Sequence, residues 1–103
     1  MKKVTVLRLS GCKYCGLLIE RLHDKGIKYT SIDANVHNTL ADEVEDLIET
    51  TEYPIVILHS NKSKPTYLFR ALDMSDIGVK DVGVATKVGF TSVKAMVEYI
   101  LNT

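Results

Sequence analysis

Hydrophobic residues follow two different spacings along the chain, and their alternation predicts a mixture of strands and helices. Four short runs are rich in branched and aromatic residues, which is typical of strands: VTVLRL (4–9), IKYTSIDA (27–34), YPIVILHS (53–60) and TYLFRA (66–71). Elsewhere, apolar residues recur every three or four positions, as they do along one face of a helix.

Three helices are predicted from this second spacing. The first has apolar positions at Cys15, Leu18, Ile19 and Leu22. It ends near Gly26, because glycine readily adopts the left-handed conformation found at helix ends.

The second and third helices each begin at a polar residue that can cap a helix. Thr39 and Asp42 resemble a capping box at the start of the second helix. Its apolar face consists of Leu40, Val44, Leu47 and Ile48. Thr91 or Ser92 is expected to cap the third. Its apolar face consists of Val93, Met96, Val97, Ile100 and Leu101.

These elements predict an α/β thioredoxin-like fold for a single domain, residues 1–103, with the order βαβαββα. A right-handed crossover makes the first two strands parallel, and a turn at SNKSKP (60–65) makes a hairpin of the last two. The expected sheet has four mixed strands and three flanking helices. The stretch 72–90 has no sustained period, so we predict a loop with room for a short strand near 82–88.

Composition narrows the class of protein. Thirteen basic and thirteen acidic residues balance, so the basic surface of a nucleic-acid-binding protein is not expected. No apolar segment approaches the roughly 20 residues that span a membrane. The lysines and apolar residues at the start of the chain resemble a signal peptide, but Arg8 interrupts the apolar run. We therefore expect a cytoplasmic protein, in which thiols are kept reduced and a permanent disulfide is unusual.

The chemistry is expected at the only two cysteines, Cys12 and Cys15, which are separated by Lys13 and Tyr14. A cysteine at a helix start faces free backbone amides and the positive end of the helix dipole, which stabilise its thiolate. Cys12 is therefore the predicted nucleophile, with a further positive charge from Lys13. Cys15 lies one turn later on the core-facing side and is the predicted resolving thiol.

A pair of cysteines can also form part of a zinc site or pack as inert buried side chains. Zinc would need further ligands, for which His23, His37 and His59 are the candidates, but their spacing is not that of a metal site and no second CxxC exists. No metal is therefore predicted. An inert buried pair would suit Cys15 but not Cys12, which lies close to two glycines at the end of a strand.

Three motifs together resemble the glutaredoxin family: SGCKYC (10–15), the Tyr-Pro pair at 53–54 and GFTS (89–92). The resemblance implies a thiol-disulfide oxidoreductase with glutathione as cosubstrate and no tightly bound cofactor. It also implies substrates that are glutathione mixed disulfides or protein disulfides.

The resemblance further implies a role for each motif residue. Tyr53 would offer backbone hydrogen bonds to glutathione, Pro54 would be cis, and Thr91 and Ser92 would hold the γ-glutamyl carboxylate at a helix start. The full set of implied substrate-binding residues is Lys13, Tyr14, Tyr53, Pro54, Gly89, Phe90, Thr91 and Ser92.

Several residues differ from the usual family pattern. Lys13 replaces a proline, Glu52 replaces a threonine, and Leu9 replaces a basic residue. The stretch 42–52 also carries six acids and no base. Two electron donors therefore remain as alternatives, glutathione and a thioredoxin-reductase-like enzyme. The second would make the protein similar to the glutaredoxin-like electron donors of ribonucleotide reductase. A noncatalytic binding module and a glutathione-bridged iron-sulfur protein are the alternatives.

Overall fold

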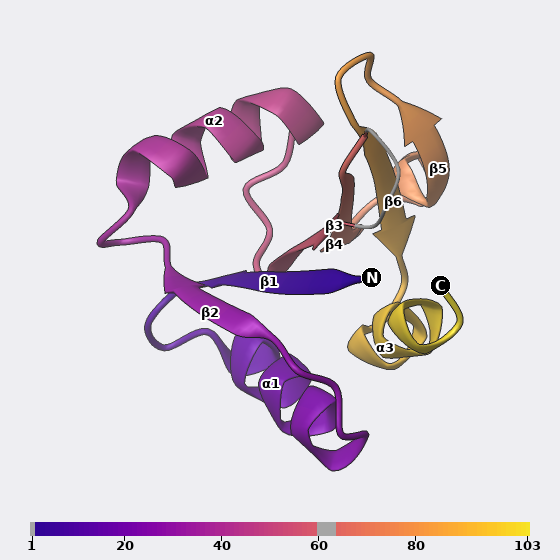
Figure 1. Ribbon diagram of the computed structural model, residues 1–103. Helices are drawn as coiled ribbons and strands as arrows, with labels where there is room; N and C mark the ends of the chain where they lie inside the picture. The colour runs from indigo at the N-terminus through magenta and orange to yellow at the C-terminus, as the bar shows by residue number, and fades with distance from the viewer. Residues whose placement is uncertain (1, 60–63) are drawn as a thin grey trace.

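The computed structural model describes residues 2–59 and 64–103, which form a mixed sheet with helices on both faces (Figure 1). In chain order the elements are β1 (Lys3–Arg8), α1 (Lys13–Asp24), β2 (Thr30–Asp33), α2 (Asn38–Ile48), β3 (Ile55–His59), β4 (Thr66–Arg70), the 3-10 helix η1 (Met74–Asp76), β5 (Gly78–Asp81), β6 (Thr86–Phe90) and α3 (Val93–Leu101). Among the described residues, no helix is long and apolar enough to cross a bilayer.

The sheet has the strand order β2-β1-β3-β4-β6-β5. β1 and β2 are parallel, and β3 is antiparallel to both β1 and β4, which confirms the predicted directions of these strands. Residues 60–63 of the predicted turn lie outside the described residues. The thioredoxin-like α/β class is thus confirmed for the first part of the chain.

The predicted count of four strands is wrong, because the stretch 72–90 contains η1, β5 and β6 rather than a loop. β6 pairs in parallel with β4, and β5 pairs antiparallel with β6 at the sheet edge. The observed order is therefore βαβαββ, then η1, β5 and β6, and finally α3. The short strand expected near 82–88 corresponds in part to β6.

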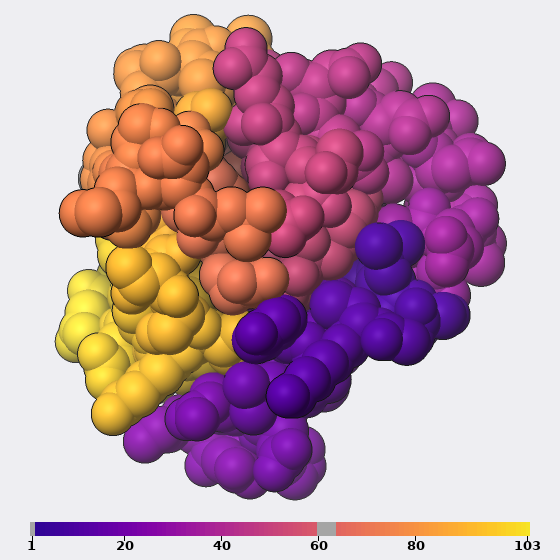
Figure 2. All heavy atoms as spheres, turned by 180° about the vertical axis from the view of Figure 1, so that it is seen from behind, coloured from indigo at the N-terminus to yellow at the C-terminus, as the bar shows by residue number. Residues whose placement is uncertain are grey.

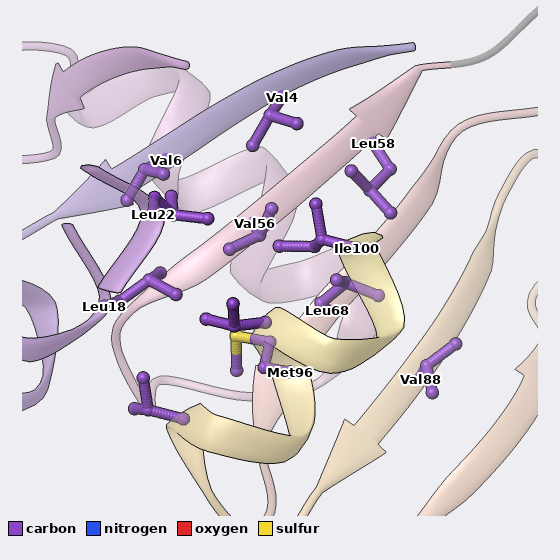
Figure 3. Packing of buried hydrophobic residues seen from close by; sticks show 12 residues of the cluster. Val4, Val6, Leu18, Leu22, Val56, Leu58, Leu68, Val88, Met96 and Ile100 are labelled. Carbon is purple, nitrogen blue, oxygen red and sulfur yellow. The ribbon is translucent and has the colours of Figure 1, made fainter. Parts of the chain in front are cut away.

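Alternation along the strands divides the core between the two faces of the sheet. On one face, Val56 and Leu68 lie beneath α1 and α3, where Leu18, Leu22, Met96 and Ile100 are fully buried (Figure 3). On the other face, neighbouring strand residues such as Ile55 and Phe69 pack against α2, which contributes Ala41, Val44 and Ile48. The predicted apolar faces of all three helices are confirmed, except that Leu101 is exposed.

Two of the three predicted helix caps are observed, and one is not. Gly26 has the predicted positive φ of 67°, and the Ser92 hydroxyl caps α3 by accepting the N–H of Ala95 at 3.1 Å. The capping box at Thr39 is wrong: α2 begins at Asn38, its N-cap is His37, and no side chain caps it. Thr39 consequently lies inside the first turn.

A buried lysine joins β6 to the end of α2. Lys87 is 7% exposed, and its Nζ donates to the carbonyl oxygen of Ile48 at 2.9 Å. The last carbonyls of a helix lack partners within the helix and carry its negative end, so a cation is favourable there.

Replacing Lys87 with methionine is expected to lower the free energy of unfolding by about 1–3 kcal/mol, because the Ile48 carbonyl would remain buried without a donor. Urea unfolding followed by circular dichroism measures the change. Lys28→Met, at an exposed lysine, is the matched control. Equal stability of the two variants would show that the bond contributes nothing.

Candidate active site

The two cysteines lie at the start of α1, as predicted. Cys12 is the N-cap residue, with its Sγ accepting the N–H of Cys15 at 3.2 Å. Their Cα atoms are 5.3 Å apart and a disulfide joins them, a separation in the usual range for such bonds. Cys12 is partly buried, whereas Cys15 is only 2% exposed and packs under α2 with Ile55 and Phe69.

This arrangement gives the two sulfurs different chemistry. When the bond is reduced, the Cys15 amide and the positive end of α1 both favour negative charge on the Cys12 sulfur. Cys12 is also the more accessible of the two. The pair can therefore attack a disulfide at Cys12 and then close on itself through Cys15.

The Tyr53–Pro54 peptide bond beside the thiols is cis, as the resemblance implied. The carbonyl oxygen of Tyr53 lies 3.8 Å from the Sγ of Cys12, whereas Pro54 itself is buried. Tyr53 thus brings its backbone, and not its ring, to the reactive sulfur.

The Tyr53 side chain is buried in the hydrophobic cluster to which α2 contributes. Its hydroxyl donates to Glu45 Oε2 at 2.6 Å. Burial raises the pKa of Tyr53, and the hydrogen bond and negative charge of Glu45 raise it further, so the hydroxyl stays a donor. Sequence reasoning missed this partner of Tyr53, because nothing in the acidic pattern of α2 marks the carboxylate of Glu45 as hydrogen-bonded.

A pocket of about 190 Å³ adjoins the cysteine motif between α1, the end of β4 and the start of α3. Tyr14 from the motif lies on its wall, and so do the predicted residues Thr91 and Ser92. Three cationic side chains, Arg21, Arg70 and Lys94, complete the polar lining. The described residues that line this pocket include no carboxylate, so its charge suits an anion.

Arg70 is the most informative residue that the sequence did not reveal. Its guanidinium carbon lies 4.0 Å from the centre of the Tyr14 ring, and its Nη2 is 3.7 Å from Glu52 Oε1. The Nε atoms of Arg70 and Arg21 are both buried without a hydrogen-bond partner in the described part of the chain. Arg70 ends the fourth strand, and only the folded sheet brings it to Tyr14.

Other predicted site residues lie outside this pocket. Lys13 is exposed to solvent. Phe90 packs edge-to-face on Tyr99, with ring centres 5.3 Å apart, and Gly89 lies under the backbone of Asp76 in η1. The motif GFTS therefore divides into two packing residues and the two that reach the pocket.

The three histidines considered as zinc ligands lie on separate elements. His23 is in the last turn of α1, His37 precedes α2 and His59 ends β3, and all three are exposed. Across residues 2–59 and 64–103, no three histidine, cysteine or acidic side chains gather in a metal-binding group.

Comparison with known proteins adds one finding to this geometry. Curated proteins give no match to the chain. A family model described as Glutaredoxin matches residues 4–62, more than half of the chain, and this range contains both cysteines and the cis-proline.

Proposed function

Because this chain belongs to the glutaredoxin family, we propose that it is a dithiol oxidoreductase that takes electrons from glutathione and reduces disulfides of proteins or glutathione mixed disulfides. Family membership and the close cysteine pair support thiol-disulfide redox chemistry. The observation that carries the proposal is the N–H of Cys15 directed at the Cys12 sulfur, at 3.2 Å, at the start of α1.

The proposed cycle uses both sulfurs. The Cys12 thiolate attacks one sulfur of the substrate disulfide, a mixed disulfide forms, and the other substrate sulfur leaves as a thiolate that takes up a proton. The Cys15 thiolate then attacks the Cys12 sulfur and releases the second substrate thiol. Two electrons pass to the substrate, and the protein is left with the Cys12–Cys15 disulfide.

Regeneration of the dithiol is proposed to use two glutathione molecules, which leave as glutathione disulfide. Glutathione is anionic, and the 190 Å³ pocket beside Tyr14 is lined by three cations and by the first residues of α3. Thr91 and Ser92 would hold the γ-glutamyl carboxylate there. Arg70 is one of the cations that line the pocket, and its Nη2 lies 3.7 Å from the Oε1 of Glu52.

Arg70→Gln is expected to raise the KM for glutathione about tenfold, equivalent to about 1.4 kcal/mol, with little change in kcat. The reason is loss of a partly buried cation beside the pocket. Initial rates at varied glutathione measure this change. Arg70→Lys keeps the charge, and Lys28→Gln removes an exposed charge elsewhere. An unchanged KM in Arg70→Gln would mean that glutathione does not use this pocket.

A coupled assay tests the proposal as a whole. Reduction of hydroxyethyl disulfide is followed through NADPH oxidation, once with glutathione and glutathione reductase and once with thioredoxin reductase. Turnover with the first pair supports the proposal. Turnover with thioredoxin reductase alone would replace the donor, and inactivity with both donors would overturn the redox function. A cytoplasmic location fits this proposal, because both reductants occur there.

A further inference from the structure

The segment that joins β4 to β6 exposes apolar side chains that serve no core. Leu72 is 71% exposed and Met74 is 85% exposed, and neither packs in the two hydrophobic clusters. Two more exposed apolar residues, Ile77 and Val79, follow in the same segment, which we call the 72–79 segment. Several such side chains within eight residues point to an interaction site.

Specific contacts hold this segment in place. The amide of Ser75 donates to Asp73 Oδ1 at 3.0 Å, and Lys80 Nζ donates to the carbonyl oxygen of Ser75 at 2.8 Å. The Asp76 carbonyl packs directly on Gly89. The apolar side chains are therefore presented to solvent by a bonded framework.

The 72–79 segment begins at the edge of the cysteine site. Arg70, two residues before Leu72, stacks on Tyr14, which lies between the cysteines in sequence. Ala71 donates its N–H to the Phe90 carbonyl at 2.8 Å, directly before the pocket residues Thr91 and Ser92. Figure 2 shows this face, on which the orange atoms after β4 adjoin the dark violet atoms at the start of α1.

We propose that the 72–79 segment binds an extended, apolar stretch of polypeptide that flanks the disulfide of a protein substrate. This inference rests on the proposed function, because the substrate sulfur must sit at Cys12. Arg70 stacks on Tyr14 and lies two residues before Leu72, so an extended chain that leaves Cys12 past Tyr14 would next meet the start of the 72–79 segment.

The edge of the sheet favours a polypeptide over a small disulfide. β5 is the outermost strand, and its far side pairs with no strand among residues 2–59 and 64–103. An extended chain can therefore add main-chain hydrogen bonds along β5 while its apolar side chains cover the exposed ones.

Two cysteine thiols of the protein become a disulfide as the disulfide of the bound substrate becomes two thiols.

A single-turnover experiment tests the proposal without any external donor. Pre-reduced protein is mixed with two synthetic peptides that share the same disulfide centre and carry fluorophores that separate on reduction. One peptide continues on both sides with leucine, valine and phenylalanine, and the other continues with serine and glycine. Leu72→Ser/Met74→Ser is compared with Val36→Ser/Val84→Ser, which removes two apolar residues outside the 72–79 segment that are 71% and 70% exposed.

We expect wild type to reduce the apolar peptide about tenfold faster than the polar peptide, and only Leu72→Ser/Met74→Ser to lose that preference. Equal rates for both peptides, or a preference that survives this double variant, would overturn the docking surface while leaving the redox function intact. Reduction of neither peptide would overturn the redox function. A dimer that Leu72→Ser/Met74→Ser dissociates would identify a second copy as the occupant, against the proposal.

Discussion

Cys12→Ser is expected to abolish disulfide reduction with either electron donor, leaving less than about one thousandth of the wild-type kcat/KM. A serine hydroxyl keeps the shape of the N-cap and can accept the Cys15 amide, but it does not ionise to a nucleophile near neutral pH. The buried Cys15, at 2% exposure, cannot take over the attack.

The matched variant Cys15→Ser separates attack from release. We expect Cys15→Ser to form a mixed disulfide between Cys12 and the substrate, which persists until glutathione reduces it. Intact-mass spectrometry should detect this adduct. It should still turn over on glutathione mixed disulfides. If Cys12→Ser retained activity and Cys15→Ser lost it, the assignment of nucleophile and resolver would have to be exchanged.

The second large effect is expected from a single methyl group at Gly89. A Cβ built at this position would lie 1.9 Å from the Asp76 carbonyl oxygen, 2.9 Å from its carbon and 3.1 Å from the Cζ of Phe69. The nearest atoms belong to the backbone, so the contact is relieved only by lifting η1 away from β6. Gly89→Ala should lower the free energy of unfolding by roughly 2–3 kcal/mol.

Urea unfolding of Gly89→Ala measures this loss, and Gly16→Ala provides the comparison. Gly16 lies in α1 with nothing within 4 Å of an added Cβ, so alanine should stabilise the helix by up to about 1 kcal/mol. Wild-type stability of Gly89→Ala would show that η1 does not rest on β6. If only the peptide preference changed, Gly89 would serve the 72–79 segment without supporting the fold.

The elements before residue 72 were predictable because their local pattern and their burial agree. β1 and β3 read as buried strands, and the Cys12 N-cap follows from a strand that runs straight into a helical period. β6 was predicted only in part, as a short strand near 82–88, because two of its three buried positions are Lys87 and Gly89. Lys87 is buried because it donates to the end of α2, and Gly89 is buried because η1 packs against it. Neither residue is hydrophobic, so neither contributes to the alternating pattern that predicts a strand.

The candidate site divides in a similar way. The position of Cys12 and Cys15 at a helix start and the cis bond before Pro54 were predicted, because they depend on neighbours in sequence or on a family motif. The contacts of Arg70 and Glu45 were not predicted, since each joins a residue on another element: Arg70 contacts Tyr14, and Glu45 contacts Tyr53. Such pairs depend on strand register and helix placement, which a local pattern does not specify.

The burial of Cys15 beside a more accessible Cys12 also has a consequence for oxidative damage. Peroxide that reaches the Cys12 sulfur would oxidise it to a sulfenic acid, which thiols can reduce. Further oxidation would give a sulfinic acid, which thiols do not reduce. With its Cα 5.3 Å away, Cys15 is placed to condense with that sulfenic acid and expel water. The product is the disulfide of the proposed cycle, so this geometry would return an oxidised Cys12 to a state that thiols can reduce.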